Sequence, residues 1–405
     1  VALLPPGPIN QGAGLTSAAI NNSARVGTSN GNFSVDASGA ATYQIAIATL
    51  PGTAGVSPQI SLTYNSQSGN GIAGRGWSIG GLSMISRCGN NYELDGFLRE
   101  VQLDQDDRFC LDGQRLVKTS STGNYGGNGV EYHTEIESFA RIRSYGDLSG
   151  GPRYFKVEGK DGSTSYYGDW CYSGSPDAAA CPLSNTSADS MVRFNTNTPA
   201  YAWGLDYMRD SARNYIAYRW LPQPVDGIEM LIDEVAYTGH HSDASAHEPF
   251  AKIKFNYNNI ANPPDPSAVQ RSVRYLRGMK LISSRYLSQV DSYSGNSVVR
   301  RYKLAYAANN PIAPELRMMQ SMTECALSSG AELCYDPVVF DWHSGENLIT
   351  ATSLECGGAG SDHCFDWDAG GVRDKEISNT VLDFDGDGTQ DSLFLINDNA
   401  CPSSP

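Results

Sequence analysis

Residues 59–83 decide the fold of this chain and read Gln59-Ile-Ser-Leu-Thr-Tyr-Asn-Ser-Gln-Ser-Gly-Asn-Gly-Ile-Ala-Gly-Arg-Gly-Trp-Ser-Ile-Gly-Gly-Leu-Ser83. Ile60, Leu62 and Tyr64 alternate with smaller polar residues, which is the pattern of a half-buried β-strand. The glycines and asparagines that follow tolerate positive φ angles. We therefore expect Trp77 to fold back onto the strand that ends at Tyr64. The residues that tolerate positive φ here are Asn65, Gly69, Asn70, Gly71, Gly74 and Gly76.

Alternating strands continue on both sides of this stretch. Residues 154–167 form two alternating runs around Lys160-Asp161-Gly162, which is typical of a tight hairpin turn, and residues 203–220 repeat the pattern. Residues 314–322 fit a short helix or a strand. Further strands are expected at residues 33–35, 41–48, 234–238, 251–257 and 298–306. We therefore predict an all-β fold, an extended and sandwich-like arrangement of multi-stranded antiparallel hairpins.

The composition agrees with many short strands. The 405 residues include 42 Gly and 22 Tyr, and only 18% are charged, which favours strands and tight turns over helix bundles. The 44 acidic residues outnumber the 29 Lys and Arg, giving a net charge of −15. Such a surface repels phosphate groups, so we expect no nucleic acid partner. No run of 18 apolar residues is present, so we expect no membrane insertion by this segment.

Eight of the nine cysteines fall into close sequential pairs. The pairs are Cys88 with Cys110, Cys171 with Cys181, Cys325 with Cys334, and Cys356 with Cys364. None has CxxC spacing, which argues against zinc or thioredoxin-type chemistry. We interpret the pairs as local disulfide loops of an exported protein, and free buried thiols in a cytosolic protein are the alternative. Cys401 is left over, and its partner is expected outside this sequence.

An acidic loop at residues 383–391 carries the clearest chemical motif and reads Asp-Phe-Asp-Gly-Asp-Gly-Thr-Gln-Asp. The expected ligands are the carboxylates of Asp383, Asp385, Asp387 and Asp391 and the backbone carbonyl of Thr389. Gly388 supplies the sharp bend, and hard oxygen ligands in a flexible loop suit Ca²⁺. Position twelve is Phe394 rather than Glu, and a strand follows, so the loop is not an EF-hand. A solvated acidic turn without metal is the alternative.

Two stretches of the chain resemble the SpvB/TcaC amino-terminal family of bacterial toxin proteins. The first begins at Ala41 and includes residues 59–83, and the second is Pro337-Val-Val-Phe-Asp-Trp342, which resembles the closing strand of that family's region. The loop at Asp383 resembles the FG-GAP or VCBS repeats that follow in the family, usually as propeller blades. The resemblance implies four segments. They are an extended leader (1–31), an SpvB-like all-β domain (32–347), a Gly/Ser-rich linker with a disulfide loop (348–378) and an incomplete calcium-loop repeat that starts a β-propeller-type domain (379–405).

The resemblance also implies a role and partners. In the family this region is not the enzyme, but part of a β-rich shell, continued by Rhs-type repeats, around a toxic domain. The expected function is therefore a non-catalytic structural module of a large secreted virulence protein. Its expected partners are the remaining segments of the same polyprotein or toxin complex subunits. An extracellular adhesion or assembly module that self-assembles into fibres or binds glycans is the alternative.

Three sets of residues are weaker site candidates. Glu135-Ile-Glu137 matches the E-x-E pair of ADP-ribosyltransferases, an activity found in the carboxy-terminal part of some family members, but we interpret it as solvent-facing carboxylates on a strand. Aromatic residues at 166–172 fit core packing, which we favour, or a surface that binds sugars or a partner. A polar loop holds His240, His241, Asp243 and His247. Their imidazole and carboxylate groups suit a transition metal, but histidines in such a loop are usually solvated without a metal.

Overall fold

The computed structural model describes most of the chain up to residue 342 and two short strands beyond it. The described residues are 27, 29–177, 181, 190–194, 198–224, 227–241, 246–259, 272–307, 317–328, 331–342, 378–382 and 391–395. The chain divides into two compact units, Val1–Trp342 and His343–Pro405. Among the described residues one helical turn, α1 (Tyr92–Asp95), accompanies the strands. No helix in this part of the chain is long and apolar enough to cross a bilayer.

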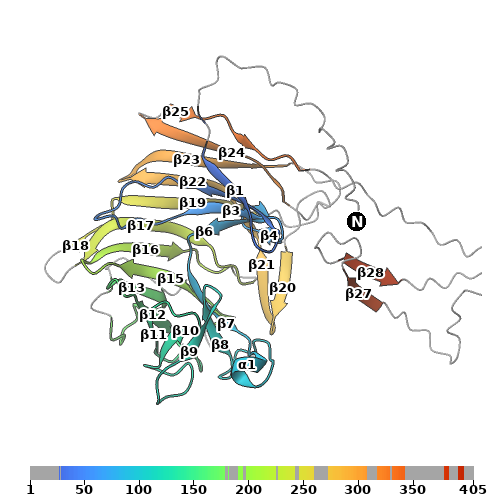
Figure 1. Cartoon of the computed structure of the whole chain (residues 1–405). Coiled ribbons are helices and arrows are strands. Elements are labelled where there is room, and N and C mark those ends of the chain that lie inside the picture. Colours follow the sequence, from blue (N-terminus) through green and yellow to red (C-terminus); the bar gives the residue numbers. More distant parts are fainter. Residues whose placement is uncertain are drawn as a thin grey trace, which may run out of the picture. The chain divides into compact units, whose positions relative to one another are not determined.

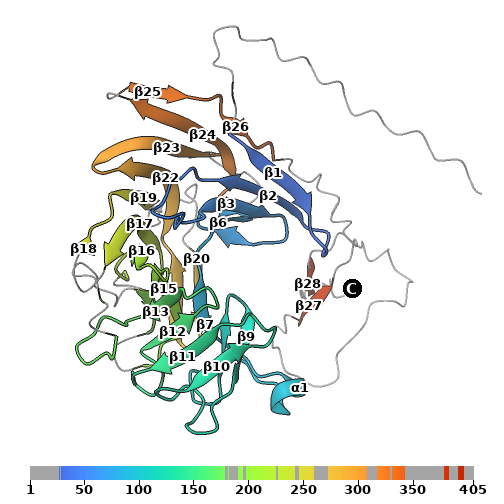
Figure 2. The same cartoon turned by 60° about the vertical axis from the view of Figure 1, so that its left-hand side comes forward.

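The first unit begins with a small antiparallel sheet in the order β1-β2-β3-β6 (Figures 1 and 2). Its strands are β1 (Gly31–Val35), β2 (Ala41–Ala46), β3 (Ser61–Asn65) and β6 (Trp77–Gly80). Between β3 and β6 a short ribbon pairs β4 (Asn70–Gly71) with β5 (Gly74–Arg75). Tyr64 pairs directly with Trp77. The expected return of Trp77 onto the strand that ends at Tyr64 is confirmed.

The next strands close into a barrel, because the last of them, β15, pairs with the first, β7. Trp203 in β15 stands opposite Ile85 in β7. The barrel follows chain order through β7 (Met84–Cys88), β8 (Arg108–Leu111), β9 (Gln114–Lys118), β10 (Glu131–Thr134), β11 (Arg141–Tyr145), β12 (Tyr154–Glu158), β13 (Thr164–Gly168) and β15 (Ala202–Arg209). A two-residue strand, β14 (Met191–Val192), also pairs with β15.

Strand β15 belongs both to this barrel and to a long open sheet. Its residues 202–204 pair with β7, and residues 207–209 pair with β16. Six of its residues, from Ala202 to Tyr207, are buried, as expected of a strand covered on both faces. The open sheet continues through β16 (Asn214–Trp220), β17 (Ile232–His241), β18 (Ala246–His247), β19 (Ala251–Asn259), β22 (Arg285–Ser294), β23 (Ser297–Tyr306), β24 (Met319–Ser328), β25 (Ala331–Cys334) and β26 (Val338–Val339).

Two hairpins stand apart from these sheets. One pairs β20 (Ser272–Leu276) with β21 (Met279–Ser283), and a single bridge joins Leu281 to Ile228. The other lies in the second unit and pairs β27 (Ser378–Leu382) with β28 (Asp391–Leu395). The loop between β27 and β28, which was predicted to bind calcium, lies outside the described residues, apart from the strand position of Asp391.

Aromatic rings fill the interior of the barrel. Trp203 is fully buried, and its ring centroid lies 5.4 Å from that of Phe109 and 5.0 Å from that of Phe155. The indole Nε1 of Trp203 donates a hydrogen bond to the carbonyl of Pro152 at 3.1 Å. Edge-to-face contacts of this kind add about 0.5–1.5 kcal/mol each beyond the burial of apolar area. The barrel is therefore a packed core.

The prediction of an all-β fold is confirmed, including hairpins at Lys160-Asp161-Gly162 and within residues 203–220. The open choice at residues 314–322 is decided for a strand from Met319 onward. The closed barrel was not predicted. The leader up to residue 26, the linker up to residue 377, and the cysteines Cys356, Cys364 and Cys401 lie outside the described residues.

Two of the residues in the motif that tolerate positive φ adopt it in the structure. Gly74 and Gly76 have positive φ angles of 107° and 75°. The other four positions, Asn65, Gly69, Asn70 and Gly71, do not have positive φ. Asn70 and Gly71 form β4, which pairs with β5 and is extended. Gly71 is needed for a close approach instead, because a Cβ there would lie 2.0 Å from the carbonyl oxygen of Trp77.

Candidate functional site

The two family-like stretches of the sequence meet in one group of aromatic rings. This closing aromatic cluster consists of Tyr43, Tyr64, Trp77, Phe340 and Trp342. The rings of Trp77 and Phe340 have centroids 4.9 Å apart, and those of Tyr64 and Trp342 lie 5.7 Å apart. The indole of Trp342 donates a hydrogen bond to the carbonyl of Met319 at 2.6 Å. The cluster thus joins the small first sheet to the end of the open sheet.

The turn before Trp77 explains how the ring reaches this position. Gly76 has positive φ, and a Cβ at this residue would lie 2.4 Å from the ring of Tyr64. Glycine therefore allows Trp77 to enter directly beside Tyr64. The Trp77 side chain is 1% exposed, and its indole Nε1 has no hydrogen-bond partner among the described residues. Within that part of the chain, packing against apolar neighbours holds this side chain.

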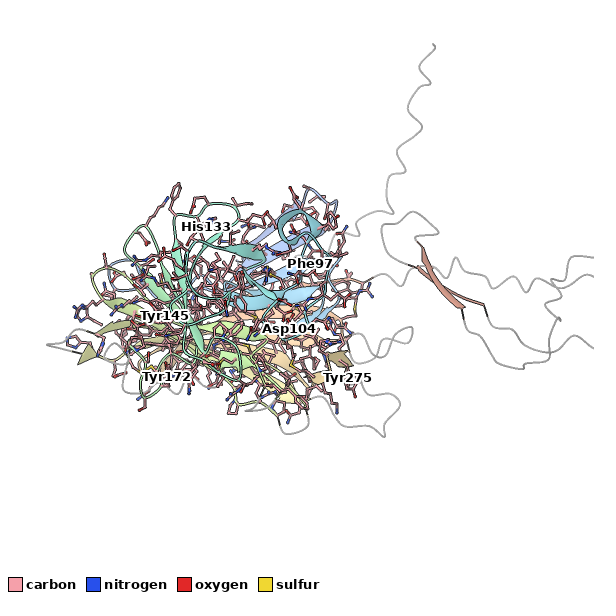
Figure 3. All side chains as sticks on the ribbon, turned by 90° about the horizontal axis from the view of Figure 1, so that it is seen from below. Phe97, Asp104, His133, Tyr145, Tyr172 and Tyr275 are labelled. Atoms are coloured by element: carbon pink, nitrogen blue, oxygen red, sulfur yellow. A yellow bond between two sulfur atoms is a disulfide. The ribbon has the colours of Figure 1, made fainter. Side chains whose placement is uncertain are left out.

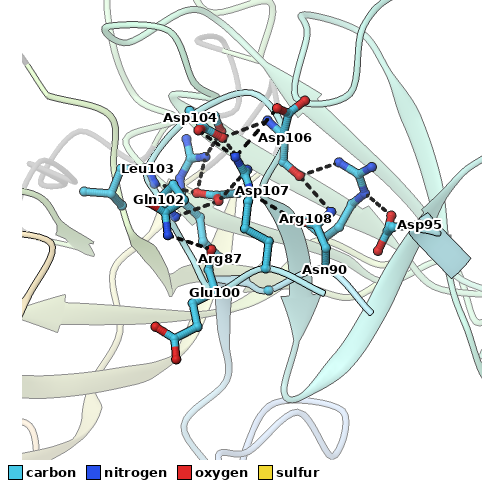
Figure 4. Close-up of polar contacts among 12 residues, drawn as sticks. Arg87, Asn90, Asp95, Glu100, Gln102, Leu103, Asp104, Asp106, Asp107 and Arg108 are labelled. Atoms are coloured by element: carbon cyan, nitrogen blue, oxygen red, sulfur yellow. Dashed lines mark hydrogen bonds and ion pairs between the residues drawn. The ribbon is translucent and has the colours of Figure 1, made fainter. Parts of the chain in front are cut away.

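A second region with many internal polar contacts is the β7–β8 loop, residues 89–107, which leaves the barrel and carries α1 (Figure 4). At its base the Arg87 guanidinium lies 3.2 Å from the Asp107 carboxylate, and the two side chains are 2% and 0% exposed. Arg87 also donates to the carbonyls of Ala200 and Asp104 at 2.8 and 2.6 Å. Burial lowers the pKa of Arg87, and the charge of Asp107 opposes that change. The pair holds the loop to the barrel wall.

Backbone groups of the loop close around the same carboxylate. Asp107 accepts hydrogen bonds from the amides of Gln102 and Leu103 at 2.8 and 2.7 Å. Above it Arg99 pairs with Asp104 at 2.6 Å. The hydrogen bond from Arg99 is the largest influence on Asp104 and lowers its pKa. The loop therefore has fixed internal partners despite its lack of regular strands.

The helical turn α1 is held by a single carboxylate. Asp95 accepts from Arg108 at 2.9 Å and from Arg115, and it also accepts from the Asn91 amide at 3.0 Å. Burial by itself would raise the pKa of Asp95, but these hydrogen bonds and the two guanidinium charges outweigh it and lower the pKa. Asn91 caps the turn by accepting from the Leu94 amide at 2.7 Å.

Beside α1 the surface is hollowed to a volume of about 640 Å³. Its lining includes Leu94 and Asp95, residues of β9 and the segment Gly123 to Tyr125. Arg108 and Arg115 line the hollow, but both guanidinium groups are already paired with Asp95. Asp95, Arg108 and Arg115 thus neutralise one another and support α1.

The residues predicted as catalytic candidates do not converge. Glu135 and Glu137 are exposed in the loop after β10, so the prediction that they lie on a strand is wrong. The strand ends at Thr134, whose hydroxyl donates a hydrogen bond to the carbonyl of Ile136 at 2.7 Å just beyond it. Glu137 accepts a hydrogen bond from the amide of Phe139 at 2.6 Å.

The histidine group is placed on strands rather than in a loop, which corrects that prediction. His240 in β17 pairs with His247 in β18, and the ring centroids lie 6.3 Å apart. Asp243 lies outside the described residues. Within the described ranges, the one group of three possible metal ligands is Cys325, Glu332 and Cys334. Its two cysteines are joined in a disulfide, so their sulfurs are not thiolate ligands.

The paired cysteines and the aromatic stretch at residues 166–172 stabilise the fold. Disulfides join Cys88 to Cys110, Cys171 to Cys181, and Cys325 to Cys334. In the aromatic stretch at residues 166–172, Tyr166 and Trp170 are fully buried, with stacked rings 4.1 Å apart. The interpretation of this stretch as core packing is confirmed for both residues.

Sequence reasoning missed the network of the β7–β8 loop. Its members are separate charged residues in an irregular segment, and no spacing rule pairs Arg87 with Asp107. One signal was available. The stretch from Arg99 to Arg108 reads Arg-Glu-Val-Gln-Leu-Asp-Gln-Asp-Asp-Arg, which is dense in opposite charges between two paired cysteines. Such a composition in a closed loop favours internal ion pairs.

Comparisons with known proteins agree with this architecture. The family model described as Salmonella virulence plasmid 65kDa B protein matches residues 35–290. No curated protein sequence matches the chain. A crystal structure of TcdB2-TccC3 matches with a TM-score of 0.59 and 18% identity, covering 78% of this chain and 17% of that one. The Tc holotoxin pore of Photorhabdus luminescens matches with a TM-score of 0.55 and 18% identity, covering 77% and 16%.

These structural likenesses show the fold, and the chain spans about a sixth of the matched toxin chains. The N-terminal domain of effector protein SpvB from Salmonella typhimurium strain LT2 is also similar, at 21% identity and a TM-score of 0.49. It is covered completely, together with 70% of this chain. The family match extends over more than half of the 405 residues. The chain belongs to the SpvB family.

Proposed function

We propose that the first unit is a non-catalytic wall segment of a large secreted toxin-type protein, where it encloses or presents other segments. The closing aromatic cluster carries this proposal. Trp77 near the start of the unit and Phe340 near its end are in ring contact at 4.9 Å, so the unit is fastened to itself. The similarity to TcdB2-TccC3, of which this chain covers 17%, supports a role as one part of a larger assembly.

Charges inside the wall serve its structure. Besides Arg87 and Asp107, the buried carboxylate of Asp291 pairs with Arg301 at 2.8 Å. The buried Glu229 pairs with Arg285 at 2.9 Å and also accepts from the amide of Ser284 at 2.7 Å. A catalytic acid or base needs access to a substrate, whereas these carboxylates are occupied by fixed internal donors. The buried ionic groups therefore support a structural role.

Secretion and partners follow from the same proposal. The disulfides support folding in an oxidising compartment. The partners are the remaining segments of a larger polypeptide or the other subunits of a toxin complex. The net charge of −15 is unfavourable for nucleic acid binding.

The proposal is tested by measuring nicotinamide release from NAD by the purified chain, together with limited trypsin digestion. We expect no release above the buffer rate, and a protease-resistant body that includes both Trp77 and Phe340. The matched variant carries Glu135→Gln and Glu137→Gln. Release that this variant abolishes would overturn the proposal in favour of an ADP-ribosyltransferase-related enzyme. Early cleavage between the barrel and the open sheet would contradict a rigid wall.

A calcium ion is proposed for the second unit. Leu382 pairs with Asp391 across β27 and β28, which supports a strand-flanked loop at residues 383–391. Titration calorimetry should detect Ca²⁺ binding that is lost in the Asp385→Asn/Asp387→Asn variant. Asp362→Asn, outside the motif, is the matched control and should bind as the wild type does. Equal binding by both variants, or none by the wild type, would remove calcium from the account.

An extracellular assembly module is the second candidate function, and one specific observation favours it. Tyr92 and Tyr275 are large aromatic side chains that are 76% and 70% exposed. Exposed rings of this size are typical of interfaces.

A further inference from the structure

Two exposed segments lie at the same end of the first unit. They are the β7–β8 loop and the β20–β21 hairpin, and both pack on one small core. Leu103 from the loop and Leu276 from the hairpin contact the buried cluster of Val192, Ala202, Ile228 and Met279. Figure 3, which shows the molecule from below, places Phe97, Asp104 and Tyr275 on this face. The loop and the hairpin therefore form neighbouring parts of one surface.

Large apolar side chains are exposed on both segments. Leu98 in the loop is 82% exposed, and Tyr275 in the hairpin is 70% exposed. The full set is Tyr92, Leu94, Phe97 and Leu98 from the loop, with Val273 and Tyr275 from the hairpin. Large apolar side chains exposed on neighbouring segments of a soluble protein mark an interaction surface. The composition is that of the centre of a protein interface.

The charges around these apolar groups differ between the two segments. On the loop the exposed charged residues are acidic, namely Glu93, Glu100, Asp104 and Asp106. The hairpin, residues 272–283, has no acidic residue. It carries Arg274, Arg277 and Lys280, none of which forms an ion pair with the described part of the chain. One face of the molecule therefore has an acidic half and a basic half.

The acidic half is held in place before any partner arrives. Asp95 and Asp107 fix both ends of the loop through Arg108, Arg115 and Arg87. The disulfide between Cys88 and Cys110 closes its base. Because the loop is already ordered, binding does not have to pay the entropy of ordering it.

We infer that this face is an interface between two copies of this chain. A twofold axis would place the basic hairpin of each copy on the acidic loop of the other, because an isologous interface is self-complementary. The apolar side chains of both copies fill the centre. The net charge of −15 opposes association of the chain with itself, so a second copy binds only where opposite charges meet. This inference goes beyond the wall function.

Charge reversal tests the pairing. One variant carries Arg274→Glu and Arg277→Glu, and the other carries Glu93→Lys and Glu100→Lys. We expect the wild type to sediment as a dimer at about 10 µM chain and each variant as a monomer, with a dissociation constant raised at least about tenfold. An equimolar mixture of the two variants should form a heterodimer, because both contacts are then between opposite charges. The control Arg75→Glu/Lys160→Glu, outside both segments, should remain dimeric.

Two outcomes would overturn the inference. A wild-type chain that stays monomeric at about 100 µM has no such interface, and variants that remain monomeric when mixed are not paired through these charges. The apolar pair Leu98→Ser/Tyr275→Ser should also give a monomer, and a dimer in that variant would place the interface elsewhere. Failure of the inference is distinguishable from failure of the wall function, because the NAD and proteolysis measurements do not depend on dimerisation.

Discussion

The closing aromatic cluster and the β7–β8 loop are fastened by opposite kinds of chemistry. Trp77 is held by ring contacts with Tyr64 and Phe340, and its indole N–H has no partner in the part of the chain that the structure describes. The loop is held by buried charges, with Arg87 and Asp107 almost without exposure. Ring packing joins two sheets over a broad contact and tolerates small changes of shape. Buried charges fix an irregular segment in one geometry and depend on every partner being present.

The largest expected effect comes from breaking the ion pair on one side. Arg87→Ala leaves the Asp107 carboxylate buried without its cation, which should lower the free energy of unfolding by about 3–5 kcal/mol. Arg99→Ala is the matched control, because Arg99 is partly exposed and should have a much smaller effect. Urea unfolding at neutral pH measures both. Equal losses in the two variants would mean that the loop is not anchored through Arg87.

Truncating a ring of the closing aromatic cluster should lower the free energy of unfolding by nearly as much. Loss of the indole N–H alone, however, should have little effect in this cluster. Trp77→Ala is expected to lower the free energy of unfolding by about 3–5 kcal/mol, since it leaves a cavity. Trp77→Phe should cost far less, because the lost N–H made no hydrogen bond. In the barrel Trp203→Phe also orphans the carbonyl of Pro152 and should cost about 1–3 kcal/mol more than its lost volume.

If Trp77→Phe proved as costly as Trp203→Phe, the indole N–H of Trp77 would have a partner in solution. The comparison between packing and polar fastening would then fail for this cluster. The same urea experiment measures both variants.

Acid should destabilise the β7–β8 loop before the closing aromatic cluster. We expect this effect to be smaller than those of the substitutions above. The pKa values of Asp95 and Asp104 are lowered from 3.8 in the folded protein. Their contribution to stability is therefore complete above pH 3.8 and is lost as pH falls through the lower folded values. Hydrogen exchange at decreasing pH should show opening of residues 89–107 while amides beside Trp77 stay protected. Simultaneous loss of protection in both regions would contradict this.

The sequence predicted the fold best where neighbouring residues determine it. Alternation at Ile60, Leu62 and Tyr64 and the turn at Lys160-Asp161-Gly162 depend on local chemistry, and the structure confirms both. Closure of the barrel depends on Ile85 meeting Trp203, and no local pattern encodes a pairing between such distant strands. The contact of Trp77 with Phe340 has the same origin.

The candidate sites show the same limit. The metal and catalytic candidates were chosen by residue type, but the side chains of Glu135 and Glu137 are exposed. The network that does exist uses Arg87, Asp95 and Asp107, whose partners come from separate strands and loops. Residue type indicates which interactions are chemically possible, whereas the fold decides which charges meet.

The account depends on the small first sheet, the barrel and the open sheet behaving as one wall fastened at Trp77 and Phe340. The most direct measurement is urea unfolding followed by tryptophan fluorescence and by hydrogen exchange of the barrel strands, in the wild type and in Phe340→Ala. We predict coincident transitions in the wild type, shifted together to lower urea in the variant. Two outcomes would contradict a single rigid wall. One is a fluorescence transition in the wild type that is separate from the loss of protection in the barrel strands, and the other is a shift in Phe340→Ala that is confined to the first sheet.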